Sequence, residues 1–306
     1  MKKITTLFVL CCFVNVLVYA QQFPIFSQYQ EMHPILNPAS VSPNFMRYGM
    51  NASISGSHRQ QWTGIADAPR TSLVSHEYVS TENHIAFGEM FLADKTGPTG
   101  FTGAYGRFSY LIEPATDFFI SVGLNAGLVQ YGVNAEELYF TQGNDIAKQD
   151  KGKWFPDFGV GAFAFKPGKW YAGVSVPQTF GLDLTFKNPL RDFSIRRLQH
   201  YYATGGAYFN INDNDYLQPA ATIRYVLHAP LQVDASVKYE YNQTFWIGVG
   251  AGTQGAVHID TGVLLFPGYN NDRLIRIGYS FENSFAVYGP KFGATHEINL
   301  NYAWKY

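Results

Sequence analysis

Apolar and polar side chains alternate along residues 231 to 241, which read LQVDASVKYEY. A period of two places successive side chains on opposite faces of a β-strand. The same alternation returns at residues 118–130, 274–282 and 297–306, far apart in the chain. The pattern therefore predicts strands with one apolar and one polar face along most of the sequence.

Turn signals between these runs divide the chain into about fourteen strands of roughly nine to fifteen residues each. We expect them near 46–57, 70–80, 83–93, 100–113, 116–130, 155–166, 169–179, 200–212, 216–227, 231–241, 243–251, 256–267, 273–283 and 294–306. Strands of this length and an even strand number are typical of outer-membrane barrels. A soluble β-sandwich also alternates and is the alternative at this point.

Composition favours the barrel. Aromatic residues make up 17% of the 306 residues, and charged residues 15% against a typical ~25%. The net charge of −1 gives no support to a nucleic-acid partner. We expect an all-β fold, a transmembrane antiparallel up-and-down β-barrel over residues 46–306, with outer-membrane lipid around it.

The first twenty residues have the order of a secretory signal peptide. Lys2 and Lys3 precede an apolar run from Ile4 to Val18, and cleavage is expected near Ala20. Both cysteines, at positions 11 and 12, lie within this segment, so we expect no disulfide in the exported chain. Export and a barrel together predict an integral protein of a Gram-negative outer membrane.

Connection lengths predict an orientation. Long connections are expected at 58–69, 94–99, 131–154, 180–199 and 284–293, and six short ones join the strands at the other rim. Such barrels place short turns in the periplasm and long loops outside. Val233 and Val237 should then face lipid, while Asp234, Lys238 and Glu240 face the lumen. Aromatic residues near strand ends are expected at the membrane interfaces: Trp170, Tyr171, Trp246, Trp304 and Tyr306.

Residues 21–45 precede the first expected strand. Pro24, Pro34 and Pro38 exclude a regular helix or central strand through this stretch. Its apolar side chains are costly to expose to water, so we expect it to plug the lumen or to brace the periplasmic mouth. The residues expected to make this plug are Phe26, Tyr29, Asn37 and Pro38.

Arg59, Gln61 and Trp62 lie in or beside the first long connection. One hypothesis is a partner-docking patch, because Trp and Arg dominate binding hot spots. The other, which we favour, is that these residues line the barrel mouth, with Arg59 paired to an interior carboxylate such as Asp94 or Glu113.

Other motifs predict no catalytic, cofactor or metal site. The GxGxxG string at 250–255 is followed by another strand rather than a helix, which indicates a hairpin. Residues 212–215 (NDND) lack the glycine and distal glutamate of a calcium loop. The eight histidines have no spacing typical of zinc ligands.

A family resemblance extends over nearly the whole mature chain. The stretches FSQYQEMHPILNPAS (26–40), HRQQWTGIADAPRT (58–71), YAGVSVPQTF (171–180) and HEINLNY (296–302) occur in the order of the PorP/SprF family. The chain resembles that family of outer-membrane proteins of the Bacteroidota type IX secretion system. His58 departs from it, since the family usually has an aromatic residue before the arginine.

The resemblance implies a non-enzymatic barrel that serves type IX secretion or gliding motility. The expected partner is a secreted adhesin, which the barrel docks and anchors through the adhesin's C-terminal domain. The alternatives are a core secretion component that contacts periplasmic ring or motor proteins, and a plugged substrate-specific channel. The inward Asp234, Lys238, Glu240, Arg276 and Glu282 argue against a lipid route.

Overall fold

The structure is a computed structural model of the chain. It describes residues 26–133, 151–179, 183–186, 193–196, 198–266, 271–286 and 289–306. The expected signal peptide and much of the 131–154 and 180–199 connections lie outside these ranges.

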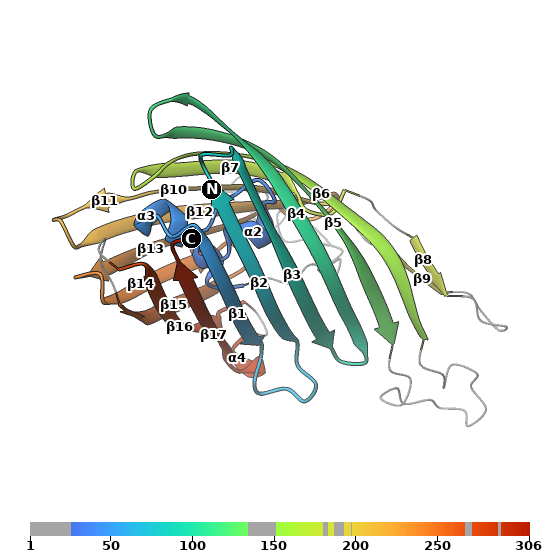
Figure 1. The fold of residues 1–306 in the computed structure, drawn as a ribbon. Helices are drawn as coiled ribbons and strands as arrows, with labels where there is room; N and C mark the ends of the chain where they lie inside the picture. The colour runs from blue at the N-terminus through green and yellow to red at the C-terminus, as the bar shows by residue number, and fades with distance from the viewer. Residues whose placement is uncertain are drawn as a thin grey trace, which may run out of the picture.

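One antiparallel sheet curves round and closes on itself (Figure 1). Its first half contains β1 (Ala52–Gln60), β2 (Arg70–Ser80), β3 (Ile85–Thr96), β4 (Thr99–Ala115), β5 (Phe118–Val133), β6 (Lys151–Lys166) and β7 (Trp170–Val176). The second half contains β10 (His200–Ala207), β11 (Phe209–Asn210), β12 (Tyr216–Val226), β13 (Gln232–Tyr241), β14 (Phe245–Gly252), β15 (Ala256–Leu265), β16 (Arg273–Ser284) and β17 (Thr295–Trp304). A separate hairpin, β8 (Asp183–Phe186) with β9 (Phe193–Arg196), lies between β7 and β10 in the chain.

The sheet closes because β1 pairs with β17 and β10 pairs with β12. Because β10 and β11 both pair with β12, they count as one strand of the wall. The described strands therefore form a closed barrel of fourteen strands. The predicted all-β barrel is confirmed. None of the helices among the described residues is long and apolar enough to cross a membrane.

The strand boundaries follow local turn chemistry. Asn242 and Gln243 both have positive φ, at 47° and 52°, in the three-residue hairpin turn 242–244 between β13 and β14. The connection expected to be long at 94–99 is also a tight turn, since Thr96 pairs with Thr99 around Gly97 and Pro98. That expectation was wrong, because Gly97 takes the φ of 53° that a short hairpin requires.

The first strand begins later than predicted. Residues 46–51 were expected in a strand, but Pro43–Tyr48 form the short helix α3. The Ser42 side chain caps it by accepting from the Phe45 backbone N–H at 3.3 Å, and Pro43 follows at its first turn. Gly49 ends it with a left-handed φ of 67°. These signals outweigh the weak alternation there, and β1 starts at Ala52.

The two faces of the wall have opposite chemistry. Large apolar side chains such as Val237, Val249 and Ile259 are exposed on the outside, while Lys238 and Glu240 are buried inside. Tyr171 and Trp246 were expected at the membrane interfaces, yet both point inward and are only 2% exposed. Successive side chains of a strand point to opposite faces, so the position of each residue in this alternation, rather than its nearness to a strand end, determines whether it faces the lumen or the outside.

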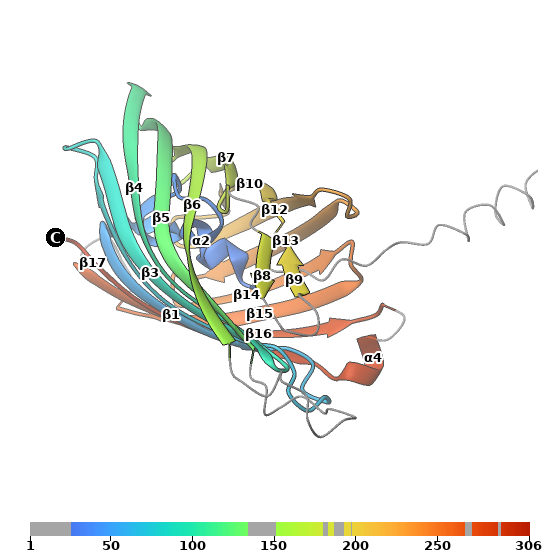
Figure 2. The ribbon, with the colours of Figure 1, turned by 90° about the vertical axis from the view of Figure 1, so that its right-hand side faces the viewer.

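The barrel has two different rims. The turns at 81–84, 116–117, 167–169 and 242–244 lie at the end where β1 starts and β17 finishes, which we call the short-turn rim. The C-terminal ends of β1, β5, β7 and β16 lie at the opposite end of the barrel, which we call the long-loop rim. Figure 2 shows α2 (His33–Leu36), near the start of the described residues, inside the curved wall.

Candidate functional site

Residues 26–50, called here the N-terminal segment, lie within the barrel. The segment contains the short helix η1 (Tyr29–Glu31), α2 and α3. All but four of its residues (Glu31, Pro34, Phe45 and Gly49) are buried. Because its helices are short, most of its backbone polar groups need partners outside regular structure, and the inner wall supplies several of them.

Asn37, Pro38 and Ala39 contact the wall directly. The Asn37 amide donates to the carbonyl oxygens of Ala162 (3.0 Å) and Val174 (3.2 Å), and its own oxygen accepts from the Ala39 N–H at 2.9 Å. The wall can approach so closely because glycine stands opposite. A Cβ added at Gly123 would lie 2.6 Å from the Ala39 Cα and from the Pro38 carbonyl oxygen.

A buried ionic cluster joins η1 to the opposite wall. The Glu31 carboxylate contacts the Lys238 ammonium at 2.6 Å and the Arg276 guanidinium at 3.0 Å. Arg276 also lies 3.9 Å from Glu240 and 4.7 Å from the Trp246 ring centroid. Two cations around one carboxylate compensate the desolvation that each charge suffers on burial.

Burial and neighbouring charges lower the pKa values of two side chains, Glu31 in η1 and His33 in α2. Burial raises the pKa of Glu31, but Arg276 and Lys238 outweigh it and lower that pKa to about 2. Burial lowers the pKa of His33 to about 4, and its ring lies 4.4 Å from that of Tyr171. Glu31 is therefore charged and His33 neutral at neutral pH.

A second ionic contact holds the segment where it turns toward α3. Arg107 of β4 pairs with Glu77 of β2 at 2.6 Å and donates to the Ser40 carbonyl oxygen at 2.8 Å. Glu77 accepts from the Ser42 N–H at 2.8 Å. The segment is thus bound through both side chains and backbone.

A third cluster lies toward the long-loop rim. Arg59 of β1 pairs with Glu282 at 2.9 Å and with Glu297 at 3.3 Å. The backbone N–H groups of Ser27 (2.7 Å) and Gln28 (3.2 Å) donate to Glu297. We call Ser27, Arg59, Glu282 and Glu297 the mouth cluster.

The partners of Arg59 differ from those named in the sequence analysis. Asp94 accepts from Thr71, and Glu113 is exposed and accepts from the Asp117 N–H at 3.1 Å. Closure of the barrel brings β16 and β17 beside β1, which linear sequence does not show. The Gln61 amide lies against Arg59, with its oxygen able to accept from Nε at 3.1 Å.

Apolar side chains are exposed above the mouth cluster. Trp62 is 37% exposed, and its ring centroid lies 5.5 Å from that of Phe292 in the β16–β17 connection. Ile65 is 39% and Phe285 67% exposed. Backbone hydrogen bonds join the two connections, from Thr63 to Ala294 (2.9 Å) and from Gly64 to Phe292 (3.0 Å). We call Trp62, Ile65, Phe285 and Phe292 the mouth surface.

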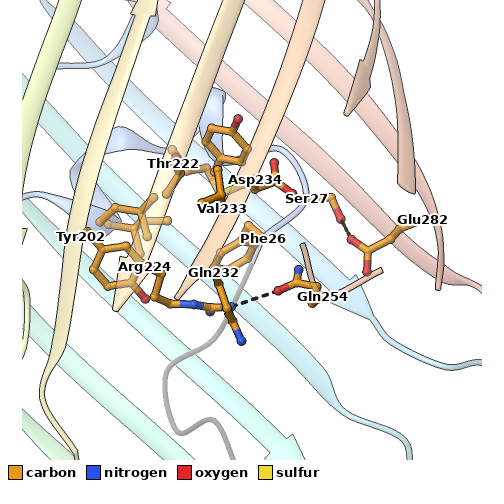
Figure 3. Close-up of a pocket in the computed structure, with 14 residues that line it drawn as sticks. Phe26, Ser27, Tyr202, Thr222, Arg224, Gln232, Val233, Asp234, Gln254 and Glu282 are labelled. Atoms are coloured by element: carbon orange, nitrogen blue, oxygen red, sulfur yellow. Dashed lines mark hydrogen bonds between the residues drawn. The ribbon is translucent and has the colours of Figure 1, made fainter. Parts of the chain in front are cut away.

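Hollows lie between the described N-terminal segment and the wall, and two of them bear on the site. The first, of about 50 Å³, is lined by Phe26, Tyr29 and Met32 of the segment and by the ends of β10, β12 and β13 (Figure 3). Figure 3 shows Ser27 beside Glu282 at one side of it, and Arg224 with Gln232 and Gln254 at the other. The second holds about 30 Å³ beside Glu31 and Arg107. Each has room for no more than a few water molecules.

Sequence comparison identifies the family. The sequence model described as type IX secretion system membrane protein PorP/SprF matches residues 18–302. The chain belongs to the PorP/SprF family. No curated protein matches this PorP/SprF chain.

Solved barrels resemble this PorP/SprF protein in fold. The CymD monoaromatic hydrocarbon channel covers 94% of this chain and 95% of its own, with 10% identity and a TM-score of 0.55. The Pseudomonas putida toluene transporter TodX covers 89% and 93%, with 9% identity and a TM-score of 0.48. A Pseudomonas aeruginosa FadL homologue covers 84% and 90%, with 10% identity and a TM-score of 0.46. At such identity, the likeness to CymD shows the outer-membrane barrel fold alone.

The residues singled out from the sequence occupy two places in the PorP/SprF barrel. Phe26, Tyr29, Asn37 and Pro38 all lie in the N-terminal segment and contact the inner wall or its hollows. Arg59 belongs to the mouth cluster and Trp62 to the mouth surface. Sequence reasoning missed Glu31, although a single acid within an apolar stretch is a signal that it needs cationic partners.

The remaining motifs of this PorP/SprF chain are turns. The side chain of Asn212 accepts from the N–H groups of Asn214 (2.9 Å) and Asp215 (2.7 Å), which shapes the turn before β12. Gly250 to Gly255 cover the end of β14 and the turn into β15. Within the described ranges no group of three or more His, Cys, Asp or Glu side chains could hold a metal. The family and the fold are those of a secretion membrane protein rather than an enzyme.

Proposed function

We propose that this barrel is a docking and anchoring partner for a secreted surface adhesin, which binds the long-loop rim through its C-terminal domain. The proposal places the long-loop rim outside the cell and the short-turn rim in the periplasm. Membership of a type IX secretion family supports the class of partner. The geometry supports the role of the barrel.

The observation that carries the proposal is the combination of an occupied lumen and an exposed mouth surface. The N-terminal segment contacts the wall through three ionic clusters, and the hollows beside it have volumes of about 50 and 30 Å³. Packing of this kind among the described residues favours a docking role over a wide passage for solute. Exposed Trp, Phe and Ile side chains are typical of a binding surface for another protein.

The mouth cluster gives that surface a fixed base. Arg59 carries two carboxylate contacts and is 2% exposed, directly before the connection that bears Trp62. A rigid base reduces the entropy lost when a partner orders the loop, so it favours affinity. The mouth surface therefore suits a folded domain that covers it from above.

The test is purification of a tagged copy from its native outer membrane in mild detergent, followed by mass spectrometry of the retained proteins. A large surface protein with a type IX C-terminal domain, lost from a Trp62→Ala/Ile65→Ala variant, is the expected result. If the natural chain and the variant retain periplasmic ring or motor proteins equally, the barrel is instead a component of the core secretion machinery. A barrel recovered alone would contradict docking.

A further inference from the structure

A second concave surface lies on the outer wall, away from the N-terminal segment and the mouth surface. It occupies about 630 Å³ at the long-loop end of β1 to β6. Its lining residues include Arg70, Lys95, Ser72, Thr102 and Gln130. These side chains project from the outer face, since their neighbours Thr71, Leu73, Phe101 and Val129 are buried inside. We call this surface the outer groove.

Strand register brings the polar residues of the outer groove into two adjacent rows. In the row nearer the rim, Arg70 pairs directly with Lys95, and Lys95 pairs with Gly100. In the next row, His58 pairs with Ser72 and donates to or accepts from its hydroxyl at 2.9 Å. Thr102 and Gln130 pair in the same row. Two cations and several hydrogen-bond donors thus face one hollow.

Small residues make room for a ligand beside these groups. Gly100, Gly132 and Gly152 continue the row of Arg70 and Lys95 across β4 to β6. A Cβ at Gly100 would meet only the Asp94 carbonyl oxygen, at 3.8 Å. Among the described lining residues, the carboxylate is that of Asp94, which accepts from Thr71 on the inner face. The described part of the outer groove is therefore hollow and is lined by two cationic side chains, those of Arg70 and Lys95.

The row below the outer groove is apolar. Val74 (54% exposed), Phe91 (62%) and Leu128 (57%) occupy outward positions two residues further from the rim on β2, β3 and β5. On a barrel wall such residues contact acyl chains. A ligand that lies across both rows needs an anionic head and an apolar body.

We propose that the outer groove binds a phosphorylated glycolipid of the membrane leaflet on the long-loop side. Arg70 and Lys95 contact its phosphate, Ser72, Thr102 and Gln130 donate to phosphate or sugar oxygens, and the row of Val74, Phe91 and Leu128 packs against the acyl chains. Arginine and lysine are the residues that hold phosphate most strongly, and hydroxyl and amide donors complete such sites. The site is independent of the proposed adhesin docking.

The test is native mass spectrometry of the detergent-purified full chain titrated with diphosphoryl lipid A. Phosphatidylcholine is the lipid without net charge, and inorganic phosphate is the free anion. We expect lipid A to bind, and an Arg70→Ala/Lys95→Ala variant to lose at least about tenfold in affinity, which is ~1.4 kcal/mol. A Gly100→Leu variant, which fills the hollow and keeps both cations, should also weaken binding.

The matched control is Arg273→Ala, which removes an exposed outward arginine at the opposite rim. It should bind lipid A as the natural chain does. Equal binding by the Arg70→Ala/Lys95→Ala variant, or an equal loss in the Arg273→Ala control, would overturn the proposal. Equal affinity for phosphatidylcholine would also overturn it, because the anionic headgroup would then contribute nothing. Displacement of the lipid by inorganic phosphate at millimolar concentration would overturn it as well, because the acyl chains would then contribute nothing.

Discussion

The lumen and the long-loop mouth of this barrel differ in the side chains that each of them contains and in how far these are exposed. Inside, Glu31 contacts Lys238 and Arg276, and its side chain is only 10% exposed. At the mouth, Trp62 and Phe285 are 37% and 67% exposed, with a ring contact from Trp62 to Phe292. Charges that would suit a surface are buried, and aromatic rings that would suit a core are exposed.

That difference indicates where stability and where binding originate. The interior contacts fix the N-terminal segment to the wall, so changes there should reduce the free energy of unfolding. Trp62, Ile65 and Phe285 of the mouth surface are exposed, so changes there should reduce partner binding and leave stability nearly unchanged. The following predictions test this division, from the largest expected effect to the smallest.

Glu31→Ala should have the largest effect on stability. It leaves Lys238 buried without this carboxylate, and among the described residues Arg276 keeps its contact with Glu240, at 3.9 Å. Breaking a buried ion pair by removing one partner costs about 3–5 kcal/mol. Thermal or urea unfolding in detergent measures the loss. The control is Glu89→Ala, since Glu89 pairs with His76 on the outer wall and should lose less than about 1 kcal/mol. Equal losses in the two variants would contradict the interior role.

Acid should destabilise the interior in a defined window. The folded pKa of His33, about 4, lies below the ordinary 6.5, so the folded state binds fewer protons than the unfolded chain between these values. The contribution of His33 to the free energy of unfolding is fully present above pH 6.5. About 3 kcal/mol of it is lost as the pH drops toward 4. Glu31 adds a second loss between about pH 4.5 and 2.

His33→Phe separates the two titrations. The ring contact with Tyr171 can persist in this variant, but the proton uptake below pH 6.5 is removed. Unfolding free energy measured from pH 7 to pH 4 should therefore fall less steeply than in the natural chain. The same slope in both proteins would show that His33 titrates normally.

Gly123→Ala should cost about 1–3 kcal/mol through overpacking. The added Cβ would lie 2.6 Å from backbone atoms of Pro38 and Ala39, which cannot rotate away. The control is Gly106→Ala on β4, where a Cβ meets nothing within 4 Å. Thermal unfolding of both variants measures the difference. If Gly123→Ala were as stable as Gly106→Ala, the segment would not lie this close to the wall.

Trp62→Ala should change stability least, by about 0.5 kcal/mol or less, as for most exposed positions. Its expected effect is on partner retention, since removal of a central Trp commonly costs about 2 kcal/mol or more of binding. Copurification with the adhesin measures it. The control is Trp154→Ala, an equally large ring that is 60% exposed on β6 outside the mouth surface. Partner loss in both variants would show a nonspecific effect.

Much of the barrel could be predicted from the sequence. Alternation gave the inward positions of Lys238, Glu240 and Arg276 correctly, and most strand boundaries lie within a few residues of those predicted. A period of two is a local property, so it survives in the sequence without knowledge of neighbours. The start of β1 was wrong because a capped helix, α3, occupies residues that alternate weakly.

Long-range contacts could not be predicted in the same way. The pairs Glu31–Lys238 and Arg59–Glu297 join residues more than two hundred positions apart. Only barrel closure places β17 beside β1, and only the path of the N-terminal segment brings Glu31 to β13 and β16. Alternation predicts that charges on the strands face inward, but it does not determine which of several inward charges of opposite sign each one contacts.

The central claim is that the N-terminal segment occupies the lumen, so that the barrel acts through its mouth surface rather than as a channel. Single-barrel conductance in a planar bilayer tests the occupied lumen most directly. At neutral pH the purified natural chain should give no steady open-pore current. Glu31→Ala, which removes the ionic contacts of η1 with β13 and β16 and so loosens this part of the segment, should give transient openings. A steady, large conductance from the natural chain would contradict the account, because the N-terminal segment could not then fill the barrel as described.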